Sequence, residues 1–143
     1  MSSLRQPYVE LSADALSHLR AIKSGLQESP LGRPLVELVY LRVSQINGCA
    51  FCLDMHARAL RALGETAARL DTLAGWRLSP HFSGRERAAL AWAESVTLIA
   101  DTQAGDDAYL PLLEHFTPQE VADLTMAAAN MNALNRLAIA MRQ

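Results

Sequence analysis

The chain has 143 residues, half of them hydrophobic and a fifth charged, so it is long enough to bury a core and fits one domain over residues 1–143. The formal net charge is −2 and the thirteen Lys and Arg residues form no basic run, which argues against nucleic acid or an anionic membrane as a partner. We expect a cytoplasmic protein, because no signal-peptide core and no apolar run near the roughly 20 residues of a membrane helix is found.

The composition predicts an all-α protein. Alanine, leucine and arginine are abundant, and glycine and proline fall mostly between periodic segments. Ser12 is a candidate N-cap for a first helix that runs to about Ser24. Pro34 suits the first turn of a second helix over 34–46. The valines of that segment also fit a buried strand, and we predict a helix because its neighbours are helical.

Glycines mark the ends of the next two predicted helices. Gly48 separates the second helix from a third, which contains both cysteines and runs to about Leu63 before Gly64. A short helix follows over residues 66–75 and is closed by Gly75.

Two capping-box spacings predict where the last long helices begin. Ser83–Glu86 opens a helix to about Ile99. Thr117–Glu120 repeats the pattern, with Pro118 at the first helical position of a helix that runs to the end of the sequence. Between them, residues 101–116 are expected to form a loop and a short helix.

The stretch from Asn47 to Thr66 contains the chemistry-bearing residues. Cys49, Cys52 and His56 have the spacing i, i+3, i+7, which places them on one helix face with both thiols near the first turn. Unpaired N–H groups there stabilise a thiolate, and Cys-X-X-Cys thiols at such sites have pKa values lowered from about 8.5 to roughly 3.5–7.5. His56 can accept the proton of Cys52, as expected of a reversible dithiol.

Glu37 is the only acid between Glu28 and Asp54, in an otherwise apolar run. If the second and third helices form an antiparallel hairpin about Gly48, Glu37 returns beside the cysteines. A buried carboxylate needs a partner, and His56 is the obvious one. The sequence therefore predicts a Glu–His–Cys relay in which the acid orients the imidazole and the imidazole activates the thiol.

Two other interpretations of these residues stay open at this point. The cysteines can be small buried apolar groups. Alternatively, Cys49, Cys52, His56 and Glu37 can supply four zinc ligands, although structural zinc sites more often take their second pair from a separate knuckle, and the sequence has none.

The pattern of Glu37, eleven residues, Cys49-Ala50-Phe51-Cys52, three residues and His56 resembles the alkylhydroperoxidase D-like (AhpD-like) proteins of the carboxymuconolactone decarboxylase superfamily. The likeness extends over residues 43–66, 73–97 and 130–142. It implies an all-α, AhpD-like helical bundle that forms a homo-oligomer, a trimer or a hexamer. A bare Cys-X-X-Cys would not be specific, but this spacing with an upstream acid is.

The resemblance also implies an activity and a role for each residue. Cys52 matches the cysteine that attacks peroxide, Cys49 the resolving cysteine that closes the disulfide and meets the reductant, and His56 and Glu37 the proton relay. The implied function is a thiol-dependent alkylhydroperoxide reductase of antioxidant type without a cofactor. Its partners are a hydroperoxide substrate and a dithiol reductant of thioredoxin-like or lipoyl type.

One position departs from part of the family. Some members have a further histidine between the cysteines, where this chain has Phe51, so a shorter relay and weaker turnover are expected. The decarboxylase branch lacks the cysteine pair, which argues against decarboxylation. The alternative function is a thiol redox sensor or a zinc-binding oligomeric module. Asn132, Asn135 and Arg136 match a polar cluster of the family, and we expect them to be structural at a subunit contact.

Overall fold

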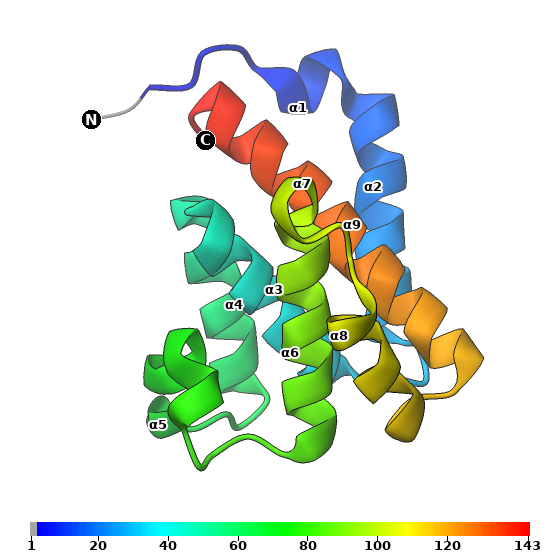
Figure 1. Ribbon diagram of the computed structural model, residues 1–143. Coiled ribbons are helices and arrows are strands. Elements are labelled where there is room, and N and C mark those ends of the chain that lie inside the picture. The colour runs from blue at the N-terminus through cyan, green and yellow to red at the C-terminus, as the bar shows by residue number, and fades with distance from the viewer. Residues whose placement is uncertain (1–2) are drawn as a thin grey trace.

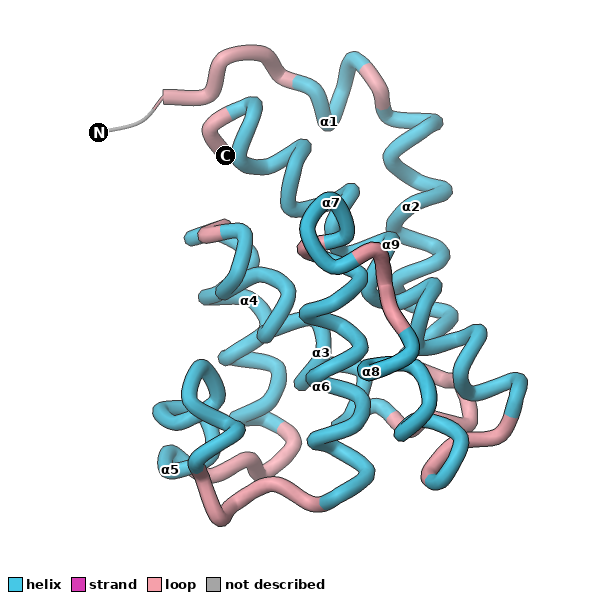
Figure 2. Tube along the Cα trace, viewed as in Figure 1, coloured by secondary structure: helices cyan, strands magenta, loops and turns pink. Residues whose placement is uncertain are grey.

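The computed structural model describes residues 3–143, which form helices joined by short loops and contain no strand (Figure 2). The predicted all-α class is therefore confirmed. Within this part of the chain, no helix combines the length and the apolar character needed to cross a membrane.

The first half of the described chain is a series of helices with brief connections (Figure 1). In chain order they are α1 (Tyr8–Leu11), α2 (Ala13–Gln27), α3 (Arg33–Asn47), α4 (Ala50–Ala62), α5 (Ala67–Thr72) and the 3-10 helix η1 (Leu73–Leu78).

The second half begins and ends with a long helix. The elements are α6 (Gly84–Thr97), α7 (Ile99–Thr102), α8 (Asp106–Tyr109), the 3-10 helix η2 (Leu110–Glu114) and α9 (Pro118–Met141).

Helix α3 is the centre of the molecule and contacts α2, α4, α6 and α9 (Figure 1). Nine of its fifteen residues are buried, and they lie on every side of the helix rather than along one stripe. A helix that is apolar all round is a core helix, and β-branched residues are tolerated in it because packing outweighs local propensity. This explains why the segment resembles a buried strand in sequence although it is helical, as predicted.

Both predicted capping boxes are present. The side chain of Ser83 accepts from the Glu86 amide, and that of Thr117 accepts from the Glu120 amide. The side chain of each glutamate in turn accepts from the backbone N–H of its cap residue. Helix α6 ends at Thr97, two residues before the predicted end, and the chain then starts the separate short helix α7.

Other boundaries also differ from the sequence prediction. Helix α1 has no counterpart in it, and α2 continues three residues past Ser24 to Gln27. The helix expected over 66–75 ends as an α-helix at Thr72, and the chain continues beyond Gly75 in η1. Residues 101–116 form two short elements, α8 and η2, in place of one.

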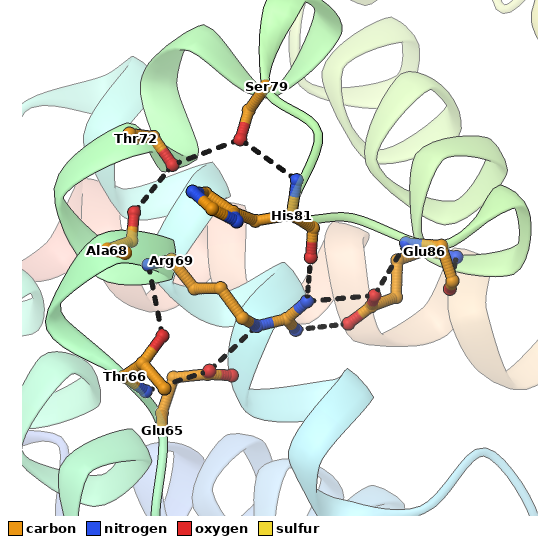
Figure 3. A network of polar contacts seen from close by, with 9 residues as sticks. Glu65, Thr66, Ala68, Arg69, Thr72, Ser79, His81 and Glu86 are labelled. Carbon is orange, nitrogen blue, oxygen red and sulfur yellow. Dashed lines mark hydrogen bonds and ion pairs between the residues drawn. The ribbon is translucent and has the colours of Figure 1, made fainter.

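Arg69 anchors α5 to the start of α6 through a polar network (Figure 3). Its guanidinium donates to Glu65 at 2.7 Å, to Glu86 and to the His81 carbonyl. The hydrogen bonds to Glu86 raise the pKa of Arg69 above its ordinary value, so the cation is permanent. Because Glu86 also belongs to the α6 capping box, this network is structural and fixes the end of the molecule formed by α5.

In residues 3–143, buried hydrophobic side chains form three clusters. The largest joins α3, α6 and α9, and a second joins α3, α4, η1 and α6. The third is small and consists of Cys49, Cys52 and Ala138, with Ile139 packed against them.

Candidate active site

The turn between α3 and α4 places the two cysteines. Gly48 ends α3 in the left-handed region, at φ +73°, which glycine adopts without a steric penalty. Cys49 is therefore the N-cap of α4 rather than a residue within it, which corrects the predicted helix start. Its sulfur accepts from the Cys52 amide at 3.3 Å. The two cysteines form a disulfide with their Cα atoms 5.3 Å apart.

Glu37 and His56 meet between α3 and α4, as the hairpin hypothesis predicts. Glu37 Oε2 lies 2.7 Å from His56 Nδ1, and both residues are 2% exposed. At this distance the pair is a strong, charge-assisted hydrogen bond, and it directs the opposite ring nitrogen of His56 away from Glu37.

Gln27, which sequence reasoning missed, holds the other oxygen of the same carboxylate. Its Nε2 donates to Glu37 Oε1 at 2.6 Å from the end of α2. A buried carboxylate has two oxygens to satisfy, so a second donor was foreseeable for Glu37. Which residue supplies it depends on how α2 packs on α3, and no spacing in the sequence indicates that.

Tyr40 packs against His56, with ring centroids 5.2 Å apart, and is fully buried. Its hydroxyl donates to the Lys23 carbonyl at 2.9 Å. Burial, followed by the charge of Glu37, raises the pKa of Tyr40, so the ring stays a neutral phenol. Tyr40 therefore restrains the imidazole by packing.

Cys52 and His56 line one cavity of about 180 Å³, whose other walls come from α2, α4, α9 and the Tyr8–Gln143 contact. Cys49 lines a different cavity, of about 170 Å³, together with Gly48. Ala138 and Gln143 line both cavities. The two cysteines thus line different cavities, although they are bonded to each other.

The asparagines of α9 connect that helix to the turn before the cysteines. Asn47 donates to Asn132 at 2.9 Å and to Asn135 at 3.0 Å, and Asn135 donates to Ser44 at 3.0 Å. Arg136 donates to Asn132 at 3.0 Å. These hydrogen bonds lie within the chain and Asn135 is fully buried, which agrees with a structural role. Arg136 is exposed, and its place at a subunit contact stays a prediction.

The zinc interpretation has no ligand cluster to support it in residues 3–143. No group of three or more His, Cys, Asp or Glu side chains there is arranged to hold a metal ion. Both cysteine sulfurs are engaged in the disulfide, and His56 Nδ1 is engaged by Glu37.

Comparison with known proteins establishes the family. Residues 13–95 match the model of the carboxymuconolactone decarboxylase family. The chain belongs to this family. The uncharacterized protein YdfG of Bacillus subtilis (strain 168), 35% identical over 139 residues, covers 97% of the chain, and the match spans 95% of YdfG.

Solved structures place this carboxymuconolactone decarboxylase family member beside AhpD-like proteins. A protein of unknown function from Agrobacterium tumefaciens, provisionally named an antioxidant defence protein AhpD, is 38% identical with a TM-score of 0.94, and the match covers 99% of this chain and 97% of that one. An uncharacterized peroxidase-related protein from Silicibacter sp. TM1040 is 27% identical with a TM-score of 0.81, and the match covers 92% of this chain and 70% of that one. The resemblance to AhpD-like proteins is confirmed.

Proposed function

We propose that the protein is a thiol-dependent hydroperoxide reductase of antioxidant type. The observation that carries the proposal is the cavity that Cys52 and His56 both line. The Nδ1 atom of His56 lies 2.7 Å from Glu37 Oε2. A nucleophile, a base and a residue that orients the base are the parts required to activate a thiol. The similar protein from Agrobacterium tumefaciens is provisionally named for antioxidant defence, which supports the same chemistry.

The reaction begins with the reduced dithiol. His56 takes the proton of Cys52, and the thiolate attacks the terminal oxygen of the hydroperoxide. The O–O bond breaks, Cys52 becomes a sulfenic acid, and the alkoxide leaves as the alcohol after taking a proton from His56. Glu37 keeps the imidazole in the orientation that this exchange of protons needs.

Cys49 completes the cycle. Its thiol attacks the Cys52 sulfur, water leaves, and the disulfide seen in the structure forms. An external dithiol then reduces this disulfide and is itself oxidised. The separate cavity at Cys49 supports an approach of the reductant from a different side than the hydroperoxide.

The proposal is tested by multiple-turnover consumption of cumene hydroperoxide, with dithiothreitol or dihydrolipoamide as reductant. Turnover by the wild type and none by Cys52→Ser supports a reductase. Oxidation that stops after one equivalent with every dithiol supports the redox sensor instead. Stoichiometric zinc in protein purified without added metal, together with no turnover, supports the metal-binding module.

The homo-oligomer stays a prediction. Phe51 and Met126 are large apolar side chains that are 41% and 52% exposed in the isolated chain, a type of surface that subunit contacts often cover. Sedimentation equilibrium decides between a trimer, a hexamer and a monomer.

A further inference from the structure

Two cations on α2 line the cavity that contains Cys52. Arg20 and Lys23 lie three residues apart on this helix, which puts them on neighbouring positions of one face. Lys23 is half-buried, and its Nζ lies 3.7 Å from the Met55 sulfur, one helical turn past Cys52. Both positive groups therefore border the space that contains the nucleophile.

No carboxylate neutralises these cations at close range. Within residues 3–143 neither Arg20 nor Lys23 makes an ion pair with an acid. Glu37 is the acid whose charge reaches Lys23, but its two oxygens are bound by Gln27 and His56. None of the side chains that line the cavity is acidic, and the backbone carboxylate of Gln143, which also lines it, makes no ion pair with either cation.

The arrangement is unfavourable without a ligand. Burial, opposed by Glu37 and reinforced by the charge of Arg20, lowers the pKa of Lys23. Like charges at this helical spacing also repel each other. An anion bound between the two side chains would offset both effects, because an opposite charge stabilises the buried ammonium and weakens its repulsion from the guanidinium.

Most of the remaining cavity wall is apolar, and the Tyr8–Gln143 contact adds a polar edge. The apolar part is formed by Leu16, Phe51, Met55, Met131, Leu134 and Ala138. A ligand that satisfies the whole cavity thus has an apolar body and one anionic end. Phe51 extends this apolar wall next to Cys52 in the sequence.

We propose that this cavity selects hydroperoxides that carry a carboxylate, with Arg20 and Lys23 binding the carboxylate while the apolar wall holds the body against Cys52. This proposal rests on the proposed reductase function and names its substrate class. The alternative is that Lys23 acts on the Cys52–His56 pair instead of the substrate. The two differ in one respect, since only a substrate-binding cation distinguishes charged from neutral hydroperoxides.

The test uses para-carboxycumene hydroperoxide and its methyl ester, which share a body and differ in charge. We expect kcat/KM of the wild type for the acid to exceed that for the ester by about tenfold or more, as a charge-assisted bond allows. Lys23→Met, which keeps an apolar stem of similar length, should lower this ratio about tenfold. Arg20→Gln, a change at an exposed side chain that the fold tolerates, should lower it by a smaller factor.

The matched control is Arg61→Gln, which removes a basic charge from the exposed side of α4, outside the cavity. It should leave the acid-to-ester ratio unchanged. A wild type that uses acid and ester equally overturns the proposal and leaves the reductase function intact. An unchanged ratio in both Lys23→Met and Arg20→Gln, with both substrates slowed together, also overturns it and assigns the cations to the thiol.

Binding separates this proposal from a failure of the reductase. Calorimetric titration with para-isopropylbenzoate and its methyl ester needs no turnover. If no hydroperoxide is consumed, the proposed reductase function fails. The anion site then stands only if the wild type binds the benzoate more tightly than the ester and Lys23→Met abolishes that difference. Equal binding of the two probes overturns the anion site as well.

Discussion

Glu37 Oε2 contacts His56 Nδ1 at 2.7 Å although the two residues are 19 positions apart in the sequence. The contact is possible because α3 and α4 fold back on each other at Gly48 and because both side chains point inward, at 2% exposure. It connects a carboxylate of the core to the cavity that contains Cys52.

Replacing Glu37 by Gln keeps the volume and removes the charge. We expect the reaction of the reduced protein with hydroperoxide at pH 7 to slow by about tenfold to a thousandfold, in keeping with the roughly 10²–10⁴ that positioned acid–base groups contribute. Raising the pH should partly restore the rate, because hydroxide then supplies the thiolate. Stopped-flow measurements across pH test this, with Glu114→Gln, an exposed acid, as the control. A profile that overlays the wild type would make Glu37 merely structural.

Gln27→Leu removes the donor that holds Glu37 Oε1 at 2.6 Å. A buried carboxylate oxygen without its donor costs about 1–3 kcal/mol of unfolding free energy, measured by urea denaturation. The pH–rate profile should shift as well, by less than in Glu37→Gln, because Gln27 acts through Glu37. In the Glu37→Gln background, Gln27→Leu should lower the unfolding free energy by a smaller amount. Strictly additive effects on the rate would show that Gln27 does not act through this carboxylate.

Serine variants of the two cysteines should stop the reaction at different steps. Cys52→Ser should abolish the reaction with hydroperoxide, because the sulfur in the cavity with His56 is gone. Cys49→Ser should allow one reaction that stops at a sulfenic acid, trapped by dimedone and detected by mass spectrometry. The opposite pattern, with Cys52→Ser still reactive and Cys49→Ser inert, would reverse the two roles.

Glu94 offers a test of stability against pH. Burial alone would raise its pKa, but hydrogen bonds from Trp76, Arg77 and Arg42 outweigh this and lower it below the ordinary 4.5. A carboxyl whose pKa is lowered by folding stabilises the protein above its unfolded pKa, and this contribution is lost as the pH falls through the folded value.

Glu94→Gln should therefore be less stable than the wild type by about 1–3 kcal/mol at pH 7. The difference between the two unfolding free energies should shrink as the pH is lowered below about 4.5, the unfolded value. Urea denaturation at several pH values measures it. A difference that stays constant down to pH ~3 would mean that the charge of Glu94 contributes nothing.

Local signals in the sequence were sufficient for much of the fold. Ser83 and Thr117 cap the helices they were predicted to open, because a capping box depends on neighbouring residues alone. The end of α6 at Thr97 and the division of residues 101–116 into α8 and η2 depend on how the chain packs on α6 and α9, which local propensity does not contain.

The site, like the fold, has one part that the sequence predicted and one part that it did not. The spacing of Cys49, Cys52 and His56 and the isolated acid Glu37 indicated a constellation that the fold brings together. The contributions of α2, namely Gln27, Lys23 and Arg20, were not foreseen. They come from a separate helix whose packing against α3 and α9 is a tertiary property, and polar residues on an amphipathic helix ordinarily indicate a solvated face.

The position of the cysteines relative to the core bears on how much the disulfide contributes to the stability of the fold. The pair belongs to a small cluster with Ala138, whereas the largest group of buried side chains joins α3, α6 and α9. The bond spans only three positions, and in the chain-entropy account the stabilisation from a cross-link grows with the length of the loop it closes. Folding is therefore supported chiefly by parts of the molecule that neither gain nor lose a covalent bond. Opening and closing the disulfide in the proposed reaction is therefore expected to leave the packing of α3, α6 and α9 unchanged.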